Sequence, residues 1–170
     1  MVPIDLQQAI DDHYDAVVRT AWILCGDRWE ADEIAQDTFL KAIDAAARFD
    51  GRSSARTWLI GICINLHRSR VRSAIRRMKR YAELAKSRSD CDTHTPDLAM
   101  QQRQWRQGLW RAVRRLPPRQ AEVVVLKYAE DMTLAQVAAT LGIAEGTAKS
   151  RLHHALAKLR QRKIEEPPES

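Results

Sequence analysis

Glycine and proline are scarce in this chain, with six of each among 170 residues. Their scarcity argues against a turn-rich β structure and favours helices. Cysteine is also rare, with Cys25, Cys63 and Cys91 at wide spacing. Three cysteines without a C-x-x-C pair fit neither a disulfide framework nor a structural zinc site. We interpret these thiols as buried or incidental, and only the neighbouring Cys91 and His94 leave a metal role open.

Long hydrophobic runs are missing as well. The longest, WLIGICI at residues 58–64, is far too short to cross a bilayer. The first fifteen residues, MVPIDLQQAIDDHYD, are acidic and lack the apolar core of a signal peptide. We therefore expect a cytoplasmic protein that does not insert into a membrane.

Patterns typical of catalysis are not found in the sequence. None of the five histidines has a nucleophile or metal partner at a mechanistic spacing, and no glycine-rich phosphate loop occurs. These histidines are His13, His67, His94, His153 and His154. The sequence predicts a protein that is not an enzyme and that holds no cofactor and no metal.

Charge is plentiful but unevenly distributed. The net charge is +6, yet residues 1–67 carry 6 basic against 11 acidic side chains. Residues 68–90 reverse this balance, with 9 basic against 2 acidic side chains. An acidic beginning followed by a basic middle indicates two different partners, one of them a polyanion.

Apolar residues recur at helical spacing through most of the chain, and no alternating strand pattern is found. The fold class we predict is all-α, with two small helical domains at residues 1–83 and 97–163. Residues 84–96 have no apolar period and are expected to form a flexible linker. Residues 164–170 are expected to be a disordered tail.

The predicted C-terminal domain contains a helix-turn-helix pattern. Thr133 and Gln136 precede an apolar run at the spacing of a capping box, and Gly142 suits the end of that helix. The following helix has an apolar side and, opposite to it, small residues between basic shoulders, an arrangement that fits the DNA major groove. An ordinary charged surface helix is the alternative. The residues expected to face DNA are Lys149, Ser150, Arg151, His153 and His154.

A helix expected over residues 30–47 has one face of small residues suited to close packing. Its opposite face mixes the acids Asp32 and Glu33 with Gln36, Leu40 and Ile43. Apolar side chains beside acids favour docking onto a basic protein partner. The alternative is that a neighbouring helix of the same chain covers the apolar side chains.

A basic run follows between residues 68 and 80. It contains seven cations and no acid, namely Arg68, Arg70, Arg72, Arg76, Arg77, Lys79 and Arg80. Mutual repulsion within such a run favours a polyanionic partner over a simple solvated face. Upstream, Phe49, Arg52, Arg56, Trp58 and Asn65 supply the aromatic, cationic and amide groups that hold an unstacked base, although Trp58 can equally belong to the core.

Two segments of the chain resemble conserved regions of sigma factors, in the same order and with a short linker between them. The first, similar to the second conserved region, is DRWEADEIAQDTFLKAIDAAARFDGRSSARTWLIGICINLHRSRVR. The second, similar to the fourth region, is LPPRQAEVVVLKYAEDMTLAQVAATLGIAEGTAKSRLHHALAKLR. Together the two matches resemble the small extracytoplasmic-function (ECF) class.

The resemblance implies a promoter-specificity subunit that binds core RNA polymerase through the β′ clamp and the β subunit, and that binds promoter DNA. It also implies control by an anti-sigma factor wedged between the domains. The clamp-binding residues would be Asp32, Glu33, Gln36, Asp37 and Leu40. The residues at melted minus-ten (−10) DNA would be Phe49, Gly51, Arg52, Asn65, Arg68 and Arg72. The second helix of the helix-turn-helix would read the minus-thirty-five (−35) element.

A stand-alone helix-turn-helix regulator that binds duplex DNA as a dimer is the main alternative. It leaves the acidic face of helix 30–47 and the cluster from Phe49 to Asn65 without a role. It also requires a dimerisation element, and the sequence shows no heptad seam.

Overall fold

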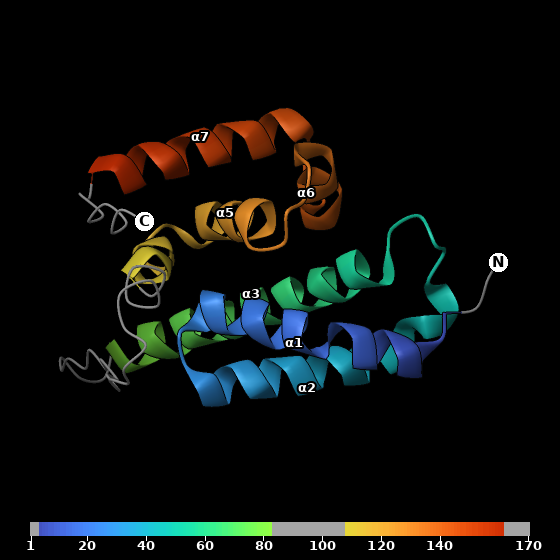
Figure 1. Cartoon of the computed structure of the whole chain (residues 1–170). Helices are drawn as coiled ribbons and strands as arrows, with labels where there is room; N and C mark the ends of the chain where they lie inside the picture. Colours follow the sequence, from blue (N-terminus) through green and yellow to red (C-terminus); the bar gives the residue numbers. More distant parts are fainter. Residues whose placement is uncertain (1–3, 83–107, 162–170) are drawn as a thin grey trace, which may run out of the picture.

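A computed structural model describes residues 4–82 and 108–161, which form two groups of helices (Figure 1). The N-terminal group is a bundle of three long helices, with a short 3-10 turn, η1, after the second of them. Its elements are α1 (Leu6–Cys25), α2 (Arg28–Ala45), η1 (Ala46–Arg48) and α3 (Ala55–Ala82). Residues 108–114 are helical and lead into the C-terminal group. That group contains α5 (Pro118–Tyr128), α6 (Leu134–Leu141) and α7 (Glu145–Gln161).

Side-chain caps explain where the three long helices begin. Asp5 and Asp27 accept hydrogen bonds from the backbone N–H groups in the first turns of α1 and α2. Ser54 caps α3 in the same way, because its hydroxyl oxygen accepts from the N–H of Thr57 at 3.2 Å. Such caps satisfy backbone donors that have no partner within the helix.

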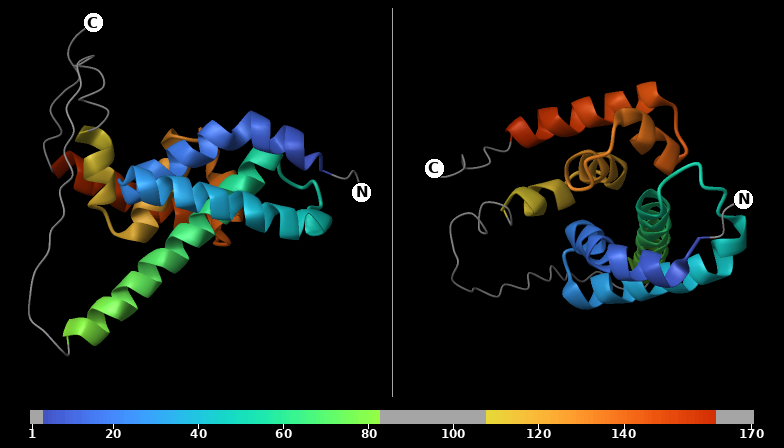
Figure 2. Two further views of the ribbon diagram at one scale, coloured as in Figure 1. Left: turned by 90° about the horizontal axis from the view of Figure 1, so that it is seen from below. Right: turned by 45° about the vertical axis from the view of Figure 1, so that its right-hand side comes forward.

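Small side chains on one face of α2 set the packing of the bundle. Ala31, Ala35 and Ala42 are fully buried, as is Ile34 between them. The absence of bulk at these positions lets α1 and α3 approach α2 closely, as predicted for the packing face of this helix. The opposite face of α2 is therefore fixed toward the outside of the bundle. The last turns of α3 project beyond the other helices (Figure 2).

The helix-turn-helix has the predicted local geometry. Thr133 and Gln136 form a reciprocal capping box at the start of α6. Gly142 ends α6 in the left-handed conformation with φ of 64°. Residues 123–126 form a continuous apolar run, VVVL, and their burial anchors α5 against α6 and α7.

The two groups pack against each other, with α5 against α1 and α6 against α3. Every regular element among residues 4–82 and 108–161 is a helix, which confirms the all-α prediction with two helical domains. None of these helices is both long and apolar enough to span a bilayer. The predicted linker at 84–96 and the predicted tail at 164–170 lie outside the described residues.

Candidate nucleic-acid and protein interfaces

The outward face of α7 presents four of its five predicted DNA-facing residues freely. Lys149, Ser150, His153 and His154 are exposed, while the opposite side of the helix packs against α5 and α6. The two imidazole rings meet edge to face at a centroid distance of 5.7 Å. This face combines hydroxyl and imidazole groups, which donate and accept hydrogen bonds, with one ammonium group.

Arg151, the fifth residue, is only partly exposed. Its side chain lines a groove of about 580 Å³ between the two helical groups, together with Arg72 and Ile75 of α3. The two basic shoulders predicted for α7 are therefore unequal in this arrangement. Lys149 points to solvent, and Arg151 points toward the N-terminal group.

The outward face of α2 carries an uncovered apolar stripe. Leu40 is 62% exposed and Ile43 is 53% exposed, so no helix among the described residues covers them. Trp29, which is 84% exposed, extends the same stripe by one turn beyond Glu33 and Gln36. Sequence reasoning missed this tryptophan, although its position four residues before Glu33 could have revealed it. We call residues 29, 32, 33, 36, 40 and 43 the docking face.

Two acids that sequence analysis assigned to protein docking are ion-paired within the bundle. Arg70 of α3 donates to Glu33 and to Asp37 of α2, both at 2.8 Å, and these bonds raise the pKa of its guanidinium. The picture of seven cations without acidic relief is therefore wrong for Arg70. The pairing was invisible in the sequence because the partners lie more than thirty residues apart. Among the described side chains, Asp32 makes no such ion pair.

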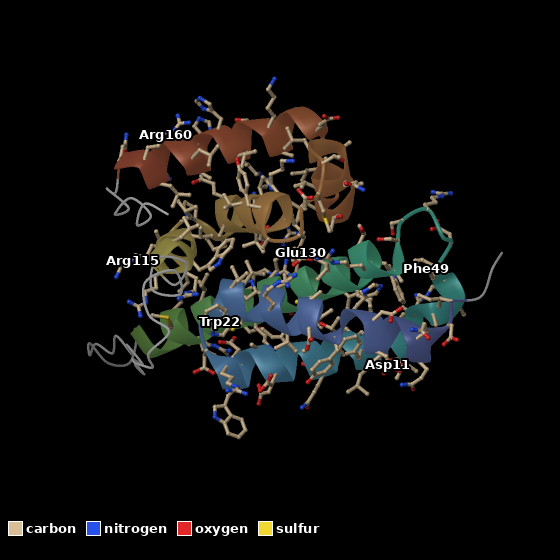
Figure 3. All side chains as sticks on the ribbon, viewed as in Figure 1. Asp11, Trp22, Phe49, Arg115, Glu130 and Arg160 are labelled. Atoms are coloured by element: carbon tan, nitrogen blue, oxygen red, sulfur yellow. The ribbon has the colours of Figure 1, made fainter. Side chains whose placement is uncertain are left out.

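The loop between η1 and α3 holds an aromatic pair. The rings of Phe49 and Trp58 lie 5.0 Å apart, and Trp58 also packs against the core. Gly51 has φ of 72°, which turns the chain at the tip of the loop. Arg52 is almost fully exposed beside Asp50, whose carboxylate accepts its backbone N–H. The loop thus presents an exposed guanidinium that is paired with Asp50, and Phe49 lies at this end of the bundle (Figure 3).

A second groove on the same bundle gathers other predicted DNA-binding residues. Asn65 and Arg72 of α3 line a volume of about 570 Å³ with Lys41 and Arg48 from the end of α2 and from η1. The structure therefore brings Asn65 and Arg72 together. Phe49, Gly51 and Arg52 do not line this groove but lie on the neighbouring loop.

Arg68 does not point freely to solvent. Its guanidinium makes a bidentate pair with Glu122 of α5, with the Nε to Oε1 distance at 2.8 Å. This pairing also corrects the expectation of an unrelieved basic run. A second acid, Glu130, accepts hydrogen bonds from Thr20, Arg19 and Arg56. The sequence analysis did not identify either glutamate. The one indication in the sequence was that Glu122 lies within the apolar, buried run of α5, where a carboxylate requires a partner.

Burial disfavours the charged form of three groups in the N-terminal bundle. Burial lowers the pKa of His67, which lies beside Glu122 and Arg68. Burial raises the pKa of the Cys25 thiol to about 11 and that of Cys63 to about 12. Within residues 4–82 and 108–161, no three potential ligands gather into a metal site. Cys91 and His94 lie outside the described residues.

Family comparisons agree with the division into two helical groups. Residues 9–85 match the family model for Sigma-70 region 2, and residues 106–159 match the model for Sigma-70, region 4. The chain is 32% identical over 157 residues to the ECF RNA polymerase sigma factor SigL of Mycobacterium tuberculosis, spanning 91% of this chain and 87% of that relative. The chain belongs to the ECF class of RNA polymerase sigma factors.

Two further relatives place this ECF sigma factor within the class. It is 28% identical to SigW of Bacillus subtilis over 89% of its own length and 85% of that relative. Its fold is similar to that of the sigma factor RpoE in a complex with the anti-sigma factor NepR from Bartonella quintana. That match has a TM-score of 0.74 at 25% identity and covers 95% of this chain and 99% of the other. In this frame the bundle α1–α3 corresponds to region 2, and α5–α7 to region 4.

Proposed function

We propose that this sigma factor binds core RNA polymerase and directs promoter-specific transcription initiation. Region 2, within residues 1–83, would bind the polymerase and melted −10 DNA, and region 4, within residues 97–163, would read −35 duplex. The chain would contribute binding and no catalysis, with no cofactor or metal. A cytoplasmic location follows from this role, since the template is the chromosome.

The uncovered docking face is the observation that carries this proposal. The docking face exposes the apolar side chains of Trp29, Leu40 and Ile43. A contiguous exposed apolar surface of this kind is typical of a protein–protein interaction site. Asp32 and the outer acid Glu33 place negative charge on the same face, which fits a basic partner. We assign this face, which includes Gln36 and has Asp37 at its edge, to the β′ clamp of core polymerase.

Two surfaces of region 2 are suited to a displaced DNA strand. The loop offers the exposed guanidinium of Arg52 and the ring of Phe49, and the groove of Asn65 and Arg72 lies next along α3. A base taken out of the stack needs a ring or amide partner, and its backbone needs cations. Gly51 allows the tight turn that exposes the loop. We assign this part of the bundle to the −10 element.

Region 4 would contact duplex DNA through α7 and the β subunit of polymerase through surfaces that promoter DNA leaves free. Ser150, His153 and His154 would read base edges, and Lys149 and Arg151 would meet phosphates. An anti-sigma factor is the expected regulator, since the similar RpoE of Bartonella quintana was solved bound to one.

Binding to core polymerase tests the proposed function. The chain should co-purify with core enzyme and, once bound, should prefer a promoter with a pre-melted −10 segment over closed duplex. A stand-alone helix-turn-helix regulator predicts the opposite pattern, with tight binding to closed duplex and no association with polymerase. That second pattern would overturn the proposal.

A further inference from the structure

Two glutamates of region 4 are buried at its junction with region 2. The side chain of Glu122 is 1% exposed, and that of Glu130 is fully buried. Figure 3 places Glu130 at this junction, between the end of α5 and the bundle below it. No lysine or arginine of region 4 forms an ion pair with either carboxylate among the described residues.

Within residues 4–82 and 108–161, the ion-pair partners of these carboxylates all come from region 2. The Glu122 carboxylate accepts two hydrogen bonds from the guanidinium of Arg68 of α3. Glu130 receives the hydroxyl of Thr20 at 2.7 Å and the guanidinium of Arg56 at 2.8 Å, with Arg19 at 3.4 Å. A buried carboxylate without a cation is strongly disfavoured. The cations that the structure describes around both glutamates are therefore in place only while the two regions are in contact.

Such contacts suit a reversible junction. Removing a carboxylate and a guanidinium from water costs free energy that offsets part of their attraction, whereas removing one partner of a buried pair leaves an uncompensated charge and is strongly destabilising. When the two regions separate, water solvates both partners again. The junction is thus specific in its closed form and still able to open.

The captured arginines lie on the nucleic-acid side of region 2. Arg68 belongs to the basic run of α3, and Arg56 lies one turn from the loop that carries Phe49 and Arg52. A guanidinium binds carboxylate and phosphate with the same paired donors. A phosphate of the promoter strand and the Glu122 carboxylate would therefore compete for one set of donors on Arg68.

The closed arrangement is also too short for a promoter. Elements centred near −35 and −10 lie about 25 base pairs apart, which is roughly 85 Å of duplex at 3.4 Å per step. A compact chain of this length has a radius of gyration of only about 15 Å. With α5 packed on α1 and α6 on α3, α7 and the −10 surface cannot reach both elements together.

We propose that Glu122 and Glu130 form an interdomain latch that holds the free sigma factor closed and keeps Arg68 and Arg56 from promoter DNA. This inference rests on the proposed function. The latch contains no segment of another protein, so it restrains the chain before any anti-sigma factor binds. Engagement of the −10 strand and of polymerase would release it by offering the arginines phosphate and by drawing region 4 away from region 2.

Neutralising the latch carboxylates gives the first test. The double variant Glu122→Gln, Glu130→Gln should enlarge the radius of gyration of the free chain in X-ray scattering. It should also bind a single-stranded −10 oligonucleotide about tenfold more tightly, because the open fraction rises. Asp131→Asn is the matched control, since it removes one charge from an exposed position beside Glu130 and keeps a residue that tolerates its φ of 52°. An unchanged radius and affinity in the double variant would overturn the proposal.

A reversible covalent lock gives a second test that does not depend on weakening the fold. A Cβ placed at Gly61 of α3 would lie 3.5 Å from Cγ2 of Thr140 in α6, so the two positions face each other across the junction. The pair Gly61→Cys, Thr140→Cys is therefore tested for a disulfide, whose formation on oxidation is checked by loss of free thiols. The native cysteines would be replaced first, with Cys25→Ser, Cys63→Ala and Cys91→Ser, and Gly61→Cys alone is the control.

The locked variant is assayed in run-off transcription with core polymerase. The latch predicts at least tenfold less transcript from the oxidised chain than from the same chain after reduction. Equal transcription in both states would show that the closed form is competent and would overturn the latch. If neither the reduced variant nor the wild-type chain supports transcription by core polymerase, the proposed function itself is refuted.

Discussion

Gly142 determines where the first helix of the helix-turn-helix ends. Its φ of 64° is strained for alanine and for most other residues with a Cβ, although the space around it is open. Gly142→Ala should therefore lower the free energy of unfolding by about 1 kcal/mol through backbone strain alone. Urea denaturation measures this change.

Gly146 is the matched control for that substitution. It lies in the first turn of α7 with ordinary helical φ, and nothing surrounds the position of its missing Cβ. Gly146→Ala should raise the unfolding free energy by roughly 0.5–1 kcal/mol, because alanine is the better helix former. Equal effects of the two substitutions would contradict the account of the turn.

His67 should make stability depend on pH. Burial lowers its pKa in the folded chain, with Arg68 acting in the same direction and Glu122 opposing it. Below the ordinary value of 6.5, the unfolded chain therefore binds the proton more readily. Stability contributed by neutral His67 should be full above pH 6.5 and should fall as the pH drops through the lower folded pKa.

His67→Phe is the variant that isolates this effect. It keeps an aromatic ring in the buried site and removes the titrating group. Unfolding free energies between pH 7 and pH 5 should decline more steeply for the wild-type chain than for the variant. Parallel declines would assign the pH dependence to other groups.

At the scale of single elements, α2 carries the contact with polymerase. Trp29→Ser together with Leu40→Ser should weaken binding to core polymerase at least tenfold, because exposed aromatic and aliphatic residues dominate such contacts. The free energy of unfolding should change little, since both side chains are exposed. Tyr128→Ser, at an exposed aromatic residue of α5, is the control. An equal loss of polymerase binding in the control variant would contradict the assignment of the docking face to core polymerase.

The base-reading residues and the phosphate-binding residue of α7 should differ in how their replacement changes the salt dependence of DNA binding. Ser150→Ala and His154→Ala should change the preference for −35 sequences more than the salt dependence of binding. Lys149→Ala should weaken all sequences alike and reduce the salt slope by about one unit. Affinities over a set of −35 duplexes at several salt concentrations measure both effects. A loss of binding in Lys149→Ala that depended on the −35 sequence would contradict the phosphate role and would indicate that Lys149 contacts a base.

Sequence patterns were sufficient for local features of the elements. The capping box at Thr133, the turn at Gly142 and the packing face of α2 depend on neighbours within a few residues, and each follows from spacing alone. The pairs of Arg70 with Asp37 and of Arg68 with Glu122 could not be predicted, because they join helices that meet only after folding. For the same reason, Arg151 was placed on a shoulder of α7 but faces region 2.

At the scale of the whole molecule, two modest binding surfaces are joined in one chain. When polymerase holds region 2 at the −10 element, the linked region 4 samples the −35 element at high effective concentration. Neither surface then needs to be strong alone. The closed form of the free chain limits DNA binding further. The contacts between regions 2 and 4 must break before the same side chains can contact DNA.

Run-off transcription with core polymerase over a promoter library tests the central claim most directly. The library varies the −35 and −10 elements independently, and transcript yield is measured with and without the chain. We expect transcription only when the chain is present, with a defined sequence preference at both elements. Transcription that is independent of the chain, or a preference at one element alone, would contradict the account of a two-region promoter-specificity subunit.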